Sequence, residues 1–224
     1  MSFDGFDRAL LRYLEELRAN NEREWFHAHR DEYETLLLEP AREFVEAAGE
    51  ELRAHVPDVE AEPRVNGSIF RIARDTRFSK DKRPYKDHLD LWFWVGDRKR
   101  GPGFWFRLTP NELLLGGGMH HFDPAQLERY RTDVVDDGRG SALQDEVERL
   151  RAAGYQIGGE RYKRTPRGFE APEDRASLLL HEGIFAWLAF SPVPAEVFTA
   201  AFPRFCAERY RPLAPLVGWL GPVA

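Results

Sequence analysis

Seven cationic side chains lie within sixteen residues of this sequence, from position 71 to position 86. Arginine can hold a phosphate or carboxylate through two parallel hydrogen bonds, and lysine adds a compact positive charge. We therefore interpret the segment as an anion-binding loop, in which every cation except Arg83 is a candidate ligand. The candidates are Arg71, Arg74, Arg77, Lys80, Lys82 and Lys86.

Three further residues of the segment have side chains that could support those cations. Asp75 and Asp81 are expected to orient them, and Tyr85 could stack on a ligand ring or donate a hydrogen bond. If the site carries out a reaction, Asp81 and Lys82 are the candidate acid–base groups. The sequence leaves open whether the protein uses a cofactor and whether it is an enzyme.

A purely structural interpretation competes with ligand binding. Asp75, Asp81 and Asp87 could pair with the cations and brace the loop against its domain. The segment from 69 to 90 holds seven cations but only four aspartates, so three cations would lack a carboxylate. This excess makes binding the first hypothesis and the brace an alternative.

The charge of the chain bears on the kind of ligand. The whole protein carries −6, whereas residues 69 to 90 carry +3, which leaves −9 for the rest. A general nucleic-acid binder would usually be basic. We therefore expect a phosphorylated or otherwise anionic small molecule, and the alternative is a non-catalytic module that recognises nucleic acid or an acidic partner.

Histidines near aspartates suggest a weaker hypothesis, a metal site. His88 and Asp90 would share one strand face, and His120 and His121 follow in a second segment. Imidazole and carboxylate are suitable ligands if the two segments meet. Surface or capping roles are the more ordinary explanation, so we assign no metal.

Composition favours a folded protein of the cytoplasm. Hydrophobic residues make up 42% of the 224 residues, and the single cysteine, Cys206, fits a reducing compartment. The charged N-terminal residues do not resemble a signal peptide. The longest apolar run, Ile184–Phe190, is far shorter than the roughly 20 residues of a membrane helix, so we expect no membrane partner.

Hydrophobic periodicity predicts the helices and strands that hold the loop, and it predicts a single α+β domain over residues 1–224. Asn21 is expected to N-cap the second of three N-terminal helices. A central antiparallel meander of about four strands should follow, and the C-terminal half should hold further helices and a short β-ribbon. The predicted ranges are 6–19, 21–37 and 40–52 for the first helices, 69–73, 89–95, 104–109 and 113–115 for the strands, 124–135 and 141–153 for the next helices, 154–170 for the ribbon and 195–210 for the last helix.

Residues 71–85 fit the pattern R-x-x-R-D-x-R-F-x-x-D-K-x-P-Y. This motif, with the helical entry "NNEREWF" at 20–26, resembles the hallmark of a bacterial conserved-hypothetical family, domain of unknown function family 2461. The resemblance spans most of the chain. It implies one autonomous domain and a special role for the motif, and it names no reaction.

Overall fold

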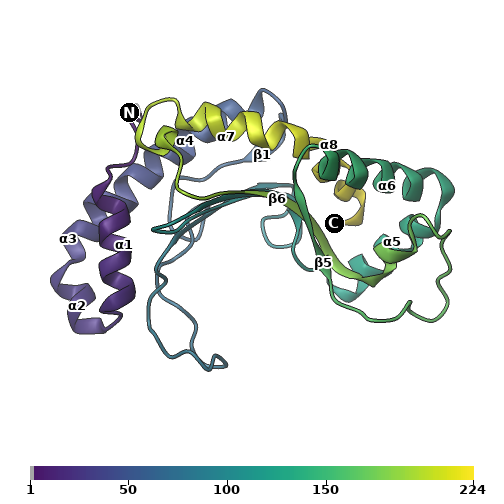
Figure 1. The fold of residues 1–224 in the computed structure, drawn as a ribbon, viewed down its shortest axis with the longest axis horizontal. Coiled ribbons are helices and arrows are strands. Elements are labelled where there is room, and N and C mark those ends of the chain that lie inside the picture. Colours follow the sequence, from purple (N-terminus) through teal and green to yellow (C-terminus); the bar gives the residue numbers. More distant parts are fainter. Residues whose placement is uncertain (1–2) are drawn as a thin grey trace. The chain divides into compact units, whose positions relative to one another are not determined.

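The computed structural model describes residues 3–224 and has the predicted α+β architecture (Figure 1). Its antiparallel sheet has six strands in the order β1-β2-β3-β4-β6-β5, so the predicted meander corresponds to β2, β3 and β4. The strands are β1 (Val59–Glu60), β2 (Leu89–Val95), β3 (Gly103–Leu108), β4 (Leu113–Met119), β5 (Gln156–Glu160) and β6 (His181–Phe190).

The helices precede and follow the meander, as the periodicity predicts. The α-helices are α1 (Ala9–Ala19), α2 (Arg23–Ala28), α3 (Arg30–Glu32), α4 (Glu39–Arg53), α5 (Pro124–Val135), α6 (Asp137–Ala152), α7 (Phe202–Tyr210) and α8 (Ala214–Leu220). One π-helix, η1 (Tyr33–Leu38), joins α3 to α4. The 3₁₀ helices are η2 (Ala176–Leu180), η3 (Ala195–Phe198), η4 (Arg211–Leu213) and η5 (Gly221–Val223).

Contacts within the chain define two compact units. Unit 1 comprises Met1–Phe93, Trp105–Leu115 and Ala189–Glu208. Unit 2 comprises Trp94–Phe104, Gly116–Leu188 and Arg209–Ala224. The single-domain organisation over residues 1–224 stays a prediction.

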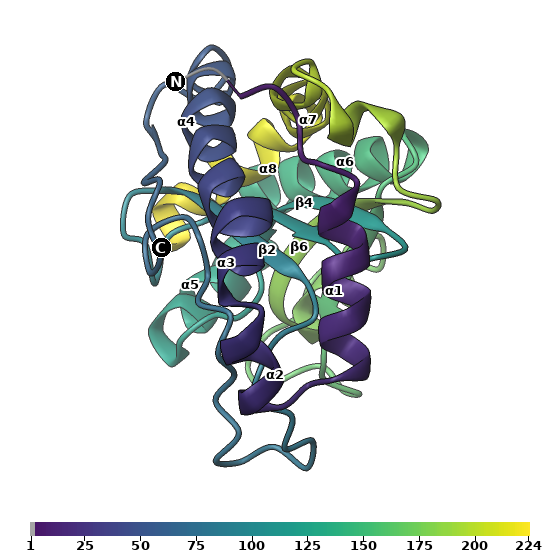
Figure 2. The same cartoon turned by 90° about the vertical axis from the view of Figure 1, so that its left-hand side faces the viewer.

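Unit 1 is built on an aromatic core that joins its helices to β3. Phe44 of α4 lies 5.0 Å from Phe202 of α7 and 5.5 Å from Phe106 of β3, measured between ring centroids. Phe3 and Phe6 close the cluster from the N-terminal side. Figure 2 shows α1 and α4 of this unit. Ring pairs of this kind stabilise a core beyond the area they bury.

The predicted strand Ile69–Ala73 is not a strand but a segment with isolated bridges to residues 85 and 91. Four backbone hydrogen bonds join residues 68–74 to residues 84–92: they run from Trp92 to Ser68, from Phe70 to Asp90, from Lys86 to Ile72 and from Arg74 to Pro84. Between the second and the third of these bonds the pairing shifts by two residues. The extra residues, within 87–89, form a bulge that interrupts the ladder and contains Asp87 and His88.

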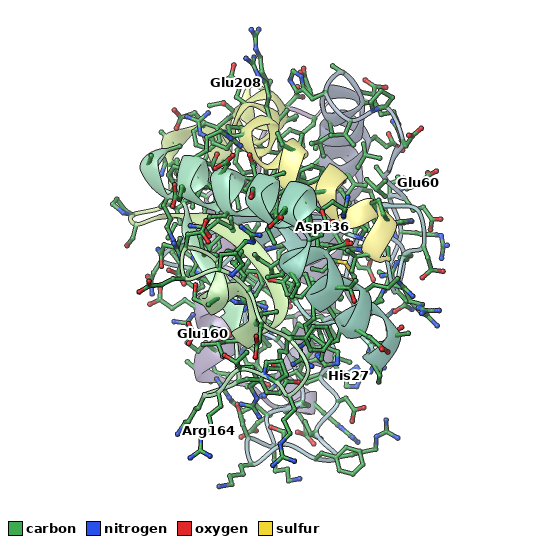
Figure 3. The ribbon with its side chains drawn as sticks, turned by 90° about the vertical axis from the view of Figure 1, so that its right-hand side faces the viewer. His27, Glu60, Asp136, Glu160, Arg164 and Glu208 are labelled. Carbon is green, nitrogen blue, oxygen red and sulfur yellow. The ribbon has the colours of Figure 1, made fainter. Side chains whose placement is uncertain are left out.

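Unit 2 packs its helices around buried tyrosines. Asp123 and Gln126 form a capping box at the start of α5, the helix that periodicity predicts over 124–135. Tyr130 of α5 is fully buried, and its hydroxyl donates to the carbonyl oxygen of Leu178. Asp136, which is labelled in Figure 3, caps the next helix, α6, by accepting from the amide of Arg139.

Two predictions for the C-terminal half need correction. The ribbon predicted over 154–170 contains one strand, β5, which pairs with β6, and the polar residues after Glu160 have no sheet partner. The helix predicted over 195–210 begins as the 3₁₀ turn η3, and α7 starts only at Phe202. None of the helices among residues 3–224 is long and apolar enough to cross a membrane.

Candidate anion-binding site

The cationic loop uses one small structural unit twice. Asp75 accepts hydrogen bonds from both the backbone amide and the guanidinium of Arg77, two residues later. Asp81 accepts the same two kinds of bond from Arg83. The sequence Asp-x-Arg therefore forms a turn closed by its own ion pair. Both turns lie in residues 74–84, which extend away from the helices of unit 1 (Figures 1 and 2).

Asp81 also ties the two ends of this loop together. A terminal nitrogen of Arg74 lies 2.7 Å from the Asp81 carboxylate, which Arg83 approaches to 2.8 Å. Hydrogen bonds from Arg83, and then from Arg74, hold the pKa of Asp81 far below its usual range. A carboxylate held ionised in this way is a poor proton carrier at neutral pH, so its geometry fits an orienting role better than a catalytic one.

Tyr85 anchors the end of the loop to the helices. Its ring stacks on Phe26 of α2 at 4.1 Å between centroids. Asn21 binds both backbone groups of Tyr85, since its side-chain amide donates to the carbonyl and its side-chain oxygen accepts from the N–H. The prediction that Asn21 caps a helix is therefore wrong: Glu22 occupies the N-cap position, without a side-chain cap.

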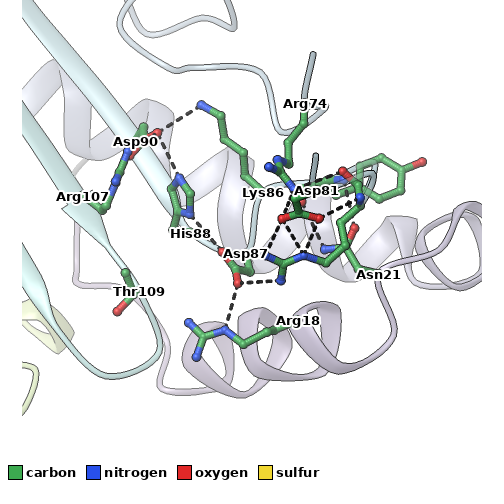
Figure 4. A network of polar contacts seen from close by, with 12 residues as sticks. Arg18, Asn21, Arg74, Asp81, Lys86, Asp87, His88, Asp90, Arg107 and Thr109 are labelled. Carbon is green, nitrogen blue, oxygen red and sulfur yellow. Dashed lines mark hydrogen bonds and ion pairs between the residues drawn. The ribbon is translucent and has the colours of Figure 1, made fainter. Parts of the chain in front are cut away.

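A second group of charges gathers around Asp90 on β2 (Figure 4). Its side chain is only 13% exposed and bonds to Arg107 of β3, Lys86 and His88. Burial raises the pKa of Asp90, but the hydrogen bonds from His88 and Arg107 outweigh burial and lower it well below the ordinary value. Asp90 is therefore ionised whenever its neighbours are in place.

His88 connects Asp90 to Asp87. Its Nδ1 lies 3.0 Å from an Asp87 oxygen, and its Nε2 lies 3.2 Å from an Asp90 oxygen. An ionised carboxylate can only accept, so both bonds exist together only when both ring nitrogens carry protons. With both nitrogens engaged, the ring has no free position for proton transfer to a ligand.

Asp87 adds two arginines to this group. Burial raises its pKa, but the hydrogen bonds from His88 and Arg18 lower it below the usual value. Nε of Arg18 lies 2.9 Å from the carboxylate, and Arg83 lies 3.6 Å from it. The connected side chains form what we call the basic network: Arg18, Arg74, Asp81, Arg83, Lys86, Asp87, His88, Asp90 and Arg107.

The basic network has more positive than negative charge. Five permanent cations share three carboxylates, which leaves +2 before His88 is counted. Arg18 donates only through Nε, and no described residue accepts from its two terminal nitrogens. In Figure 4 these nitrogens point away from Asp87. Their fork can hold an anion through two parallel bonds.

The other predicted anion ligands lie outside the network, and three of them, Arg77, Lys80 and Lys82, belong to the loop of residues 74–84. Lys82 donates to the carbonyl oxygen of Thr76. Arg71 and Lys80 are exposed, and no described carboxylate lies within ion-pair distance of either. The ring of Phe78, beside Arg77, is 95% exposed. The structure thus brings only Arg74 and Lys86 of the six candidates into one network.

Several network residues were not among the predicted site residues. Arg107 could have been found, because Asp90 and Arg107 are lone charges within two apolar segments predicted as neighbouring strands. Arg18 gives no such signal, since it is one of many charges on the outer face of a helix. Arg83 belongs to the motif but not to the predicted set of anion ligands.

The histidines and aspartate of the metal hypothesis do not come together as a set of ligands. Within residues 3–224, no three or more histidine, cysteine, aspartate or glutamate side chains gather as metal ligands. His88 and Asp90 bond to each other, and His120 packs against the ring of Phe185 at 4.1 Å. His121 lies on the surface.

An α+β protein with a braced basic loop and a half-buried charge network is the class that these features define. The chain belongs to a family of conserved hypothetical proteins, DUF2461, whose model matches residues 9–219. The resemblance carried by the motif is thereby confirmed. Searches of curated proteins and of solved structures found no match.

Proposed function

We propose that this protein binds a small anionic molecule, such as a phosphate ester or a carboxylate, at the basic network. The observation that supports the proposal is the surplus of charge, because three carboxylates serve five cations in a half-buried position. Partial burial of uncompensated charge is costly, and an anion would offset that cost.

Arg18 is the residue that we expect to contact the ligand most directly. Its Nε is fixed by Asp87, so the guanidinium is oriented before the ligand arrives. A side chain held in place in advance loses less freedom on binding. Arg107 and Lys86, both held by Asp90, would supply further positive charge.

Binding without proton transfer fits this geometry best. His88 is engaged at both nitrogens, and Asp81 is held by two guanidinium groups. We place the protein in a reducing compartment such as the cytoplasm, since its single cysteine, Cys206, cannot form an internal disulfide.

A thermal-shift screen tests the proposal with inorganic phosphate, sugar phosphates, nucleotides and small carboxylates. A ligand at 100 times its dissociation constant adds about 2.7 kcal/mol to the free energy of unfolding. The matched variants are Arg18→Gln and Arg12→Gln, which remove the same charge from α1. Arg12 is exposed and makes no ion pair with a described residue. A shift that Arg18→Gln abolishes and Arg12→Gln preserves supports the proposal, and equal shifts in all three proteins with every ligand of the screen refute it.

The exposed tip of the loop favours a second candidate function, recognition of an anionic macromolecule. Phe78 is almost fully exposed, and Arg77, Lys80 and Lys82 beside it are exposed as well. An exposed ring among cations can stack on the bases of a single-stranded nucleic acid. Fluorescence anisotropy of a labelled oligonucleotide, with the wild type and Phe78→Ser, tests this candidate.

A further inference from the structure

A second basic segment, in unit 2, lies outside the motif. Residues 161–169 hold Arg161, Lys163, Arg164 and Arg167 without any acidic residue, a net charge of +4. Arg161 approaches Glu182 to 3.8 Å, whereas no described carboxylate is within ion-pair distance of the other three. Figure 3 shows the Arg164 side chain directed away from the ribbon. In contrast to the motif loop, most of this charge has no internal partner.

Arg131 of α5 lies against this segment and adds a fifth cation to the cluster. Its guanidinium carbon lies 5.0 Å from the ring centroid of Tyr162 and 5.9 Å from that of Phe169. Its Nε is buried without a hydrogen-bond partner, and no described carboxylate pairs with the side chain. Aromatic faces stabilise a guanidinium but accept none of its N–H groups in a strong hydrogen bond. The terminal nitrogens therefore remain available to an anionic ligand.

A cavity of about 490 Å³ adjoins this cluster. Residues 165–171, with Ala176 and Leu179, line it, and they include Arg167, Phe169 and one carboxylate, that of Glu170, whereas Arg131 adjoins the cavity through Phe169. The volume is within the range of small-molecule sites, about 300 to 1,000 Å³. Phe169 thus contacts Arg131 and also offers the cavity an apolar wall.

We propose that this cavity binds a phosphorylated nucleoside. Arg131 and Arg167 hold the phosphate, because both are cations without a carboxylate partner and both contact or line the cavity wall. The planar base packs against Phe169, as bases do on aromatic side chains. Lys163 and Arg164 add positive potential that attracts the dianion.

Isothermal titration of the full chain with AMP, adenosine and inorganic phosphate tests this proposal. We expect AMP to bind the wild type more tightly than either fragment, since only AMP offers both a phosphate and a base. Arg131→Gln and Arg167→Gln should each weaken AMP binding at least tenfold. Arg151→Gln, which removes an exposed charge from α6, should leave it unchanged.

Arg167→Gln guards the test against misfolding, because its side chain is exposed and makes no hydrogen bond to a described residue. An octathymidylate titration distinguishes a free nucleotide from a nucleic-acid strand as the ligand. Absence of AMP binding up to 10 mM overturns the proposal, as does equal binding by Arg167→Gln. Tighter binding of the oligonucleotide than of AMP also overturns it. Variants of the basic network, such as Arg18→Gln, should not alter AMP binding to this cavity, so the two proposals fail separately.

Discussion

Asp90 and Arg107 face each other across strands β2 and β3, and two hydrogen bonds of 2.7 and 3.2 Å join their side chains. The bond from Val95 to Pro102 sets the strand register that places them opposite. Asp90 is the more buried partner, and it also holds Lys86 and His88. The pair therefore fixes part of the basic network to the sheet.

A double-mutant cycle on this pair should give a coupling free energy of about 1 to 2 kcal/mol, because the bonds are charge-assisted but Arg107 is half-exposed. The measurement is urea unfolding of the wild type, Asp90→Asn, Arg107→Gln and the double variant. Additive changes in the free energy of unfolding would mean that the pair contributes nothing beyond its separate residues.

Acid should weaken the network. The pKa values of Asp87 and Asp90 are lower in the folded protein than the usual value of about 3.9, so their contribution to stability is complete above that value and is lost as the pH falls below it. Unfolding measured between pH 6 and pH 3 should show a smaller loss of stability in Asp90→Asn than in the wild type. Asp58→Asn, at an exposed site, should keep the wild-type slope. If the wild type and Asp90→Asn lost the same stability between pH 6 and pH 3, the lowered pKa of Asp90 would be contradicted.

Asn21 should matter more than its neighbour Asn20. Asn21→Ala removes both hydrogen bonds to the backbone of Tyr85 and should cost about 1 to 3 kcal/mol of unfolding free energy. Asn20→Ala removes one exposed bond to Glu16 and should cost less. Equal losses of unfolding free energy in the two variants, measured by chemical denaturation, would show that the hydrogen bonds from Asn21 to Tyr85 make no special contribution to stability.

Loss of the Arg74–Asp81 pair should loosen the loop without unfolding the protein. Arg74→Gln should increase the rate of chymotrypsin cleavage after Phe78 several-fold, because the pair joins the two ends of the loop. Arg71→Gln removes an exposed charge from the same segment and serves as the control. Cleavage of Arg74→Gln at the wild-type rate would show that the Arg74–Asp81 pair does not restrain the loop.

Phe78 should be dispensable for folding. Its ring is 95% exposed, so Phe78→Ser should change the free energy of unfolding by no more than about 0.5 kcal/mol. If the tip recognises single-stranded nucleic acid, the same variant should lower oligonucleotide affinity severalfold in anisotropy titrations. Unchanged affinity for a bound oligonucleotide would locate the contact elsewhere.

The fold was more predictable from the sequence than the site. Helical periodicity identified α1, α4 and α5, because one face of each helix is apolar. Local pattern could not reveal the bulge at 87–89, which depends on pairing with residues 68–74. The motif itself indicated the loop, whereas the approach of Arg18 to Asp87 joins residues 69 positions apart.

The segment 161–169 illustrates the same difficulty. Its charges were plain in the sequence, but the contact between Arg131 and Phe169 depends on how the chain returns to α5. Spacing along the chain carries no signal for a contact of that kind. The motif is conspicuous in the sequence by its charge density alone. In the structure, however, four of its seven cations are bound to aspartates.

The most direct test of the central claim is calorimetric titration of inorganic phosphate into the wild type, Arg18→Gln and Arg12→Gln. We expect the wild type and Arg12→Gln to bind phosphate with the same affinity and Arg18→Gln to bind it at least tenfold more weakly. Equal binding by all three proteins would contradict an anion site at Arg18, as would the absence of any heat of binding in the wild type with phosphate or with any other anion of the thermal-shift screen.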